Sequence, residues 1–372
     1  MENWDLFYPI KIAKRYNNKK RSYLLVNMIQ GKHIPVRPDM ALNMYEVLGK
    51  KIKKKYPDAK LIIGFAETAT ALGFGTASAM GNDCTYLTTT RESSIANSDC
   101  ILFYEEHSHA AEQKMYIRGF DLLLKRTKEV VFIDDEISTG KTLFNIINAL
   151  KVRFNELENH KIIVGSILNR VTTERENDFK KHNIYFESIF RFSSNDNSLL
   201  QNGKELCAPS DEYYDKPGFL PKVSLMDFKN SRIQVNVRDY LNNCKQLGKI
   251  ILNQLDFQGV AKFLVLGTEE CMYPSIYIAK MIEKEYGIET YCHSTTRSPI
   301  CIGNDSDYPF INGYMLHSFY DDNRITYIYN LSRYDAALII SDATEPSEQA
   351  LKSFDSLLDS FKISKRFYVF GR

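Results

Sequence analysis

The chain has 372 residues, of which 44% are hydrophobic and 25% charged, a balance that allows a large buried core and favours two domains over one. Its 48 lysine and arginine residues nearly cancel its 46 aspartate and glutamate residues, so no global field of one sign favours long nucleic acids or acidic membranes. Residues 1–5 lack a basic flank followed by an apolar run, and no apolar stretch of about eighteen residues is present. We therefore expect a cytoplasmic protein without a nucleic-acid or membrane partner.

Short apolar runs alternate with longer amphipathic stretches in the first half of the chain. The strands predicted there cover residues 23–29, 60–65, 101–104, 129–133 and 161–168. Pro38 and Asp39 open a predicted helix with Leu42, Tyr45 and Leu48 on one face. The alternation predicts a mostly parallel α/β sheet.

Residues 201–222 form a connection rich in glycine and proline. We therefore predict a first domain at 1–205, a linker at 206–232 and a second domain at 233–372. The second domain has a helical pattern at 235–255. Its predicted strands cover residues 262–266, 289–293, 325–330 and 336–340, which indicates another α/β unit.

The second half repeats landmarks of the first in the same order. The matched segments are 59–64 with 261–267, Thr88 to Ser93 with Ser294 to Pro299, 107–108 with 317–318, and the end of the strand near Asp134 with Ser341 to Thr344. Four ordered matches favour a duplicated fold over chance. The second copy lacks the turn that follows Asp134 and is degenerate there.

The segment Val130 to Thr142 carries the clearest chemistry. An apolar strand ends in Asp134 and Asp135, where carboxylates can accept hydrogen bonds from the vicinal hydroxyls of a ribose. The turn that follows exposes backbone N–H groups at the start of a helix, which suits a monophosphate; its residues are Ser138, Thr139, Gly140, Lys141 and Thr142. A P-loop needs a glycine where Asp135 stands, and an ordinary strand-turn-helix corner is the other alternative.

This segment resembles the phosphoribosyl pyrophosphate (PRPP) signature of type I phosphoribosyltransferases, whose Rossmann-like parallel sheet is then the expected fold. The resemblance implies that Asp134 and Asp135 hold the ribose hydroxyls and that residues 138–142 bind the 5-phosphate. Glu136 stands where an uncharged residue is more usual. The turn after the first core strand resembles the pyrophosphate-binding loop of the family, and its residues are Ala66, Glu67, Thr68, Ala69 and Thr70. Close helix packing by small residues is the alternative for that turn.

Further polar residues are candidates for catalysis. Arg91 is placed like the arginine that the family holds near pyrophosphate, with a surface arginine as the alternative. The interval from 104 to 119 resembles the mobile loop that covers the active site in this family, and its candidates are His107, His109, Lys114 and Arg118. A zinc pair at His107 and His109 lacks the further ligands of a zinc signature.

The tetrapeptide Thr296-Arg297-Ser298-Pro299 extends the resemblance to one branch, found in tellurite-resistance and stress-response gene clusters, with a C-terminal TRSP domain. In that domain, the candidate residues at strand ends are Glu269, Glu270, Arg297, Ser298 and Asp342. They either complete the pocket or recognise the acceptor, or they satisfy one another in a purely structural half.

The resemblance implies transfer of ribose 5-phosphate between PRPP and a nucleobase-like small-molecule acceptor, or the reverse cleavage. Mg²⁺ is the expected cofactor, held mainly through PRPP rather than by a standing protein site. A homodimer is compatible with this reading. The alternative is a regulatory protein that senses PRPP or nucleotides without catalysis. The acceptor contacts are the least readable, with Tyr23, His33 and Arg37 as guesses.

Overall fold

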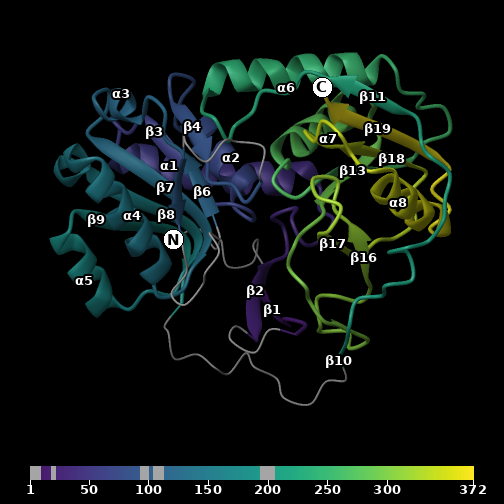
Figure 1. The fold of residues 1–372 in the computed structure, drawn as a ribbon, viewed down its shortest axis with the longest axis horizontal. Coiled ribbons are helices and arrows are strands. Elements are labelled where there is room, and N and C mark those ends of the chain that lie inside the picture. The colour runs from purple at the N-terminus through teal and green to yellow at the C-terminus, as the bar shows by residue number, and fades with distance from the viewer. Residues whose placement is uncertain (1–9, 18–21, 93–99, 104–112, 193–205) are drawn as a thin grey trace. The chain divides into compact units, whose positions relative to one another are not determined.

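The computed structural model describes residues 10–17, 22–92, 100–103, 113–192 and 206–372 (Figure 1). Two compact units are present. We call the first the six-stranded unit; it contains Asn43–Asp196 and Lys229–Asn242. The second, the five-stranded unit, contains Met1–Leu42, Asn197–Phe228 and Asn243–Arg372. Each unit combines segments from both sides of the predicted boundaries at residues 205 and 233. The division of the chain into consecutive domains stays a prediction.

The six-stranded unit has a central sheet that is parallel except at one edge. The order of its strands is β12 (Val235–Asn236), β4 (Thr85–Thr88), β3 (Leu61–Gly64), β7 (Glu129–Ile137), β8 (Lys161–Asn169) and β9 (Ile184–Arg191). Only β12 is antiparallel to its neighbour. Its helices are most of α1 (Pro38–Lys55), then α2 (Thr70–Met80), α3 (Phe120–Leu124), α4 (Lys141–Arg153), the 3₁₀ turn Asn155–Asn159 and α5 (Thr173–Lys181).

The buried core of this unit explains why its central strands are rich in apolar residues. Strand β3 and the part of β7 from Val130 to Ile133 are continuous apolar runs, as expected for a parallel sheet covered on both faces. Phe65 and Phe132 stack with ring centroids 5.9 Å apart. Leu143, Ile147 and Leu150 lie on one buried face of α4 and join the same core.

The five-stranded unit is built on a wholly parallel sheet. The order of its strands is β11 (Val223–Met226), β19 (Lys365–Gly371), β18 (Ala336–Ile340), β13 (Lys262–Gly267) and β14 (Glu289–Ser294). All four pairings are parallel. Its helices are α7 (Tyr273–Tyr286), α8 (Glu348–Ser360) and most of α6 (Val237–Leu252).

Short antiparallel pairs complete the two units. They are β1 (Ile10–Lys14) with β2 (Tyr23–Asn27), β10 (Leu206–Cys207) with β15 (Ile302–Gly303), β16 (Gly313–His317) with β17 (Ile325–Tyr329), and, in the six-stranded unit, β5 (Cys100–Phe103) with β6 (Gln113–Tyr116). The strands predicted from residues 101 and 325 onward are present as β5 and β17, but they pair in hairpins outside the main sheets.

The α/β fold class with two parallel-rich sheets is confirmed. The segment before Leu42 belongs to the five-stranded unit, where Val36 exchanges two backbone hydrogen bonds with Cys292. Within the part of the chain that the structure describes, no helix is both long enough and apolar enough to cross a bilayer.

Candidate ribose-phosphate site

The strand β7 continues through the acidic residues instead of ending before them. Its ladder with β8 pairs Asp134 with Ser166 and Glu136 with Leu168, so the predicted end at residue 133 is four residues too early. Asp134 and Asp135 are both half-buried. They lie at the carboxyl end of a central strand, where ligands bind in parallel α/β sheets.

The two adjacent aspartates are electrostatically coupled. Burial raises the pKa of Asp134 well above its usual value of 3.8, and the neighbouring charges of Asp135 and Glu136 raise it further. The backbone N–H of Asp135 donates to Asp134 Oδ1 at 3.0 Å. Glu136 instead accepts a charged hydrogen bond from Arg170 at 3.3 Å. A ligand that brings hydroxyl donors or a cation to Asp134 therefore stabilises its ionised form.

The turn after β7 leads directly into α4. Gly140 precedes the helix with φ of +71°, in the left-handed region that favours glycine. A Cβ atom at this position would lie 2.9 Å from the Cζ atom of Phe179. Both the backbone and the available space thus require glycine. The flanking residues Ser138, Thr139, Lys141 and Thr142 are exposed.

The predicted pyrophosphate loop joins β3 to α2. Ala66 and Glu67, joined by a cis peptide bond, are buried, and Thr70 begins the helix. The backbone N–H of Ala66 donates to Thr89 Oγ1 at 2.8 Å, and Tyr86 donates its hydroxyl to the carbonyl of Thr70 at 2.7 Å. Thr68 and Ala69 lie between these anchored points.

Thr89 and Tyr86 are residues that the sequence reasoning missed as supports of this loop. Thr89 also donates to Gln113 Oε1 at 2.6 Å, which connects the loop to β6. Thr89 lies inside a segment that the sequence had singled out for Arg91. The signal available was a run of three threonines at the end of a strand, which is typical of side chains that bond to nearby backbone.

The other predicted catalytic residues are spread over several places. Lys114 lies on β6, buried, and its backbone exchanges two hydrogen bonds of 2.8 Å with Thr90. Arg91 directly follows Thr90 in the chain and is exposed. His107 and His109 lie outside the described residues. Lys114 and Arg91 are thus held at the end of β4, next to the strand that carries the predicted loop.

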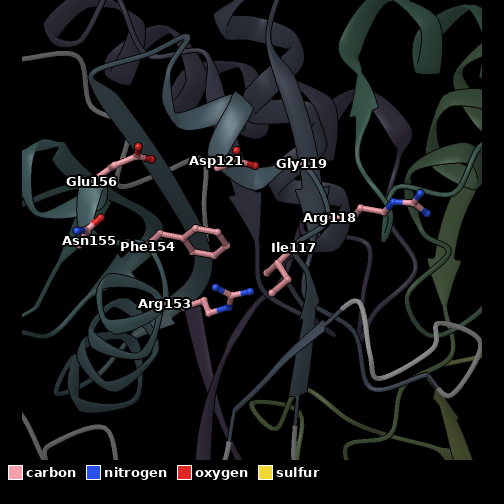
Figure 2. A pocket seen from close by; sticks show the side chains of 8 residues that line it. All are labelled: Ile117, Arg118, Gly119, Asp121, Arg153, Phe154, Asn155 and Glu156. Carbon is pink, nitrogen blue, oxygen red and sulfur yellow. The ribbon is translucent and has the colours of Figure 1, made fainter.

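Arg118 lies elsewhere. It lines a pocket of about 470 Å³ together with Asp121 and Arg153, at the carboxyl end of α4 (Figure 2). The turn that includes Gly140 precedes the opposite end of this 13-residue helix, which is about 20 Å long. The structure therefore does not bring Arg118 together with Asp134.

Three candidates of the five-stranded unit contact one another, whereas Asp342 and Ser298 form hydrogen bonds with tyrosines. Arg297 donates through Nε to Glu269 at 2.6 Å and lies 3.9 Å from Glu270. Asp342 accepts from the Tyr320 hydroxyl at 2.7 Å. Ser298 accepts at its carbonyl from the Tyr329 hydroxyl at 2.9 Å.

The guesses for acceptor contacts also belong to the five-stranded unit. Tyr23 is exposed, whereas Arg37 pairs with Glu283. His33 is buried, and this burial lowers its pKa to about 3, so the ring is neutral.

Comparison with known proteins gives matches to two family models. A family model described as "Phosphoribosyl transferase" matches residues 10–193, and one described as "TRSP domain C terminus to PRTase_2" matches residues 233–361. No curated protein matches the chain. One similar solved structure is a hypothetical protein from Neisseria gonorrhoeae with bound ppGpp. The two chains are 11% identical, the match covers 44% of this chain and 85% of that chain, and the TM-score is 0.28.

Proposed function

The chain belongs to the family of phosphoribosyltransferase-type proteins that carry a C-terminal TRSP domain, and we propose that it transfers ribose 5-phosphate between PRPP and a nucleobase-like acceptor. The observation that carries the proposal is the end of β7. Two coupled carboxylates, Asp134 and Asp135, are followed after four residues by the left-handed Gly140 that opens α4. This order offers acceptors for a diol and backbone donors for a phosphate within one short segment.

Different residues of the six-stranded unit bind different parts of PRPP in this proposal. Asp134 and Asp135 hold the ribose hydroxyls, and the N–H groups of residues 138–142 hold the 5-phosphate. The turn from Ala66 to Thr70, anchored by Thr89, faces the pyrophosphate. In the forward direction a bond forms from the acceptor nitrogen to the anomeric carbon, while the bond from that carbon to the pyrophosphate oxygen breaks and pyrophosphate leaves with its electron pair.

Mg²⁺ is the proposed cofactor. Among the residues that the structure describes, no three histidine, cysteine or carboxylate side chains come together in a way that could hold a metal. The donors at Asp134 and Asp135 are nevertheless oxygens, the ligands that Mg²⁺ prefers, and their mutual repulsion favours a bound cation. When bound, the ion neutralises charge on the pyrophosphate.

Binding of PRPP is the direct test. We expect the double variant Asp134→Asn, Asp135→Asn to lose calorimetrically detectable binding of PRPP with Mg²⁺, because the amides carry no negative charge to strengthen hydrogen bonds from the diol or to attract the cation. Asp121→Asn, which changes an acid in the Arg118 pocket of the same unit, is the matched control and should bind normally. Undiminished binding in the double variant would refute the assignment.

Turnover separates catalysis from sensing. The wild-type protein is incubated with PRPP, Mg²⁺ and a panel of nucleobase-like metabolites, and products are identified by mass spectrometry. Release of pyrophosphate together with a new ribose-phosphate adduct supports the transferase. Tight binding without release for the panel and for cell extract supports a PRPP sensor instead.

A further inference from the structure

The loops after β3 and β13 are each held by an equivalent hydrogen bond, from a backbone N–H to a threonine hydroxyl. In the six-stranded unit, the backbone N–H of Ala66 donates to Thr89 Oγ1 at 2.8 Å. In the five-stranded unit, the backbone N–H of Glu269 donates to Thr295 Oγ1 at 3.0 Å. Each threonine follows the strand that pairs with the loop's own strand. Glu269 therefore occupies the position of Ala66.

A second pair of hydrogen bonds extends this equivalence by one residue. Thr90 exchanges two backbone hydrogen bonds with Lys114, both of 2.8 Å. Thr296 exchanges two with Tyr327, of 2.9 and 2.7 Å. The residues that follow these threonines are Arg91 and Arg297, so the two arginines are equivalent as well.

At the position equivalent to the small Ala66, the five-stranded unit carries the longer, charged side chain of Glu269. Its carboxylate is only 1% exposed and accepts from Arg297 Nε at 2.6 Å. Arg324 Nη1 lies 3.4 Å from the same oxygen, and the Ser318 hydroxyl donates to the other oxygen. Two guanidinium groups and a hydroxyl thus surround one buried anion.

The surroundings of this carboxylate remain positive. Lys32 is completely buried and donates through Nζ to the carbonyl oxygens of Glu269, at 2.5 Å, and Thr295, at 2.9 Å. With Arg297 and Arg324 it supplies three cationic side chains around the loop, against the carboxylates of Glu269 and Glu270. Guanidinium groups in this arrangement suit the oxygens of phosphate and pyrophosphate as well as those of a carboxylate.

We propose that Glu269 is an internal anion that closes a pyrophosphate-type anion site at the strand ends of the five-stranded unit. The carboxylate takes the place that a phosphate oxygen cluster would occupy between Arg297 and Arg324. This inference rests on the proposed function in one respect, the assignment of the loop after β3 as the pyrophosphate-binding loop. Its consequence is that the native five-stranded unit binds no pyrophosphate and that one chain takes one PRPP.

The test counts binding sites for inorganic pyrophosphate by calorimetry. Glu269→Ala should bind one more pyrophosphate per chain than the wild type, because Arg297 and Arg324 no longer pair with the Glu269 carboxylate. If the proposed function is wrong, the wild type binds none and the variant binds one. If only the present inference is wrong, the two proteins bind the same number.

A matched control removes another buried carboxylate of the same unit. Asp355 on α8 is buried, lies 2.9 Å from Arg366 Nε and accepts from the Tyr368 hydroxyl at 2.8 Å. Asp355→Ala should gain no pyrophosphate site. If Asp355→Ala gained a pyrophosphate site as Glu269→Ala does, any arginine that loses a carboxylate partner would suffice. That result would overturn the proposal.

A milder variant decides the case if Glu269→Ala does not fold. Glu269→Gln keeps the shape but removes one negative charge beside Arg297 and Arg324, so folding should depend on added anions. Its melting temperature is expected to rise with added pyrophosphate by several degrees more than that of the wild type. Equal responses of the two proteins would reject the internal anion.

Discussion

The two parallel sheets can be compared residue by residue where their middle strands end. Gly64 on β3 pairs with Ile133 on β7, and Gly267 on β13 pairs with Ile340 on β18. After Ile133 come two aspartates, whereas Ser341 and Asp342 follow Ile340. Seven residues after each isoleucine stands the residue that precedes a helix. The backbone frame is therefore shared, and the side chains placed on it differ.

The two helix starts show what this difference does. Before α8, Ser347 caps its own helix, since its hydroxyl accepts from the backbone N–H of Ala350 at 3.1 Å. Before α4, Gly140 has no side chain to do so. The positions that follow are Glu348 and Lys141, of opposite charge. One helix start is satisfied from within and repels anions, while the other suits a bound phosphate.

Copying the acidic helix start into the six-stranded unit is the strongest test of this contrast. Lys141→Glu should weaken PRPP binding by about 10- to 100-fold, because a charged hydrogen bond worth roughly 1.5–3 kcal/mol is replaced by repulsion. Calorimetry with Mg²⁺ measures the loss. Lys125→Glu, an equally exposed reversal just after α3, should change affinity little. Similar losses in both variants would mean that only the overall charge matters.

Asp134, at the acidic end of β7, predicts that the free energy of unfolding depends on pH. Ser341 holds the equivalent place in the other sheet and has no ionisable side chain to give such a dependence. Because the folded pKa of Asp134 is raised above 3.8, the folded chain keeps a proton that the unfolded chain loses as pH rises through this window. The contribution to the free energy of unfolding is fully present below pH 3.8 and is lost as pH rises through the folded pKa. Its slope is at most about 1.4 kcal/mol per pH unit.

Denaturant unfolding at a series of pH values isolates this contribution. The wild type minus Asp134→Asn difference in free energy of unfolding should fall as pH rises and then level off. A difference that is constant with pH would contradict the raised pKa. In the wild type, added Mg²⁺ and PRPP should flatten the slope, because they favour the ionised carboxylate.

Much of the fold was readable from the sequence because local patterns determine it. The apolar runs of β3, β7, β8, β13 and β18 and the turn at Gly140 were all predicted, and the fold class followed from their alternation. The runs that became β5 and β17 were recognised as strands but not as hairpin strands. A run of four or five apolar residues does not reveal its partner, which depends on contacts distant in the chain.

Other features depend on long-range contacts from the start. The hydrogen bonds between Val36 and Cys292 place the amino-terminal segment with the five-stranded unit, and nothing near Val36 in the sequence indicates this. The buried contacts of Glu269 with Arg297 and Arg324 also join residues that are far from neighbours in the sequence. For the site itself, the motif supplied Asp134 to Thr142, but the hydroxyl of Thr89 that anchors the neighbouring loop required the structure.

The smallest expected effect concerns the glycine that has no counterpart before α8. Gly140 and Gly119 have similar left-handed backbones, with φ of +71° and +75°. An alanine at either position bears a cost of about 1–2 kcal/mol for that conformation. At 119 no heavy atom lies within 4 Å of the new Cβ, whereas at 140 the ring of Phe179 lies 2.9 Å away. The difference between the two variants therefore measures the contact with Phe179.

Phe179 cannot easily move to relieve that contact. It is buried, and its ring lies edge-on to Phe144 at 5.6 Å and to Phe186 at 5.1 Å. Gly140→Ala should lower the free energy of unfolding by about 1 kcal/mol more than Gly119→Ala, as measured by denaturant unfolding. Equal losses would show that the ring yields freely. In that case only the backbone conformation, and not the packing against α5, would require glycine at the start of α4.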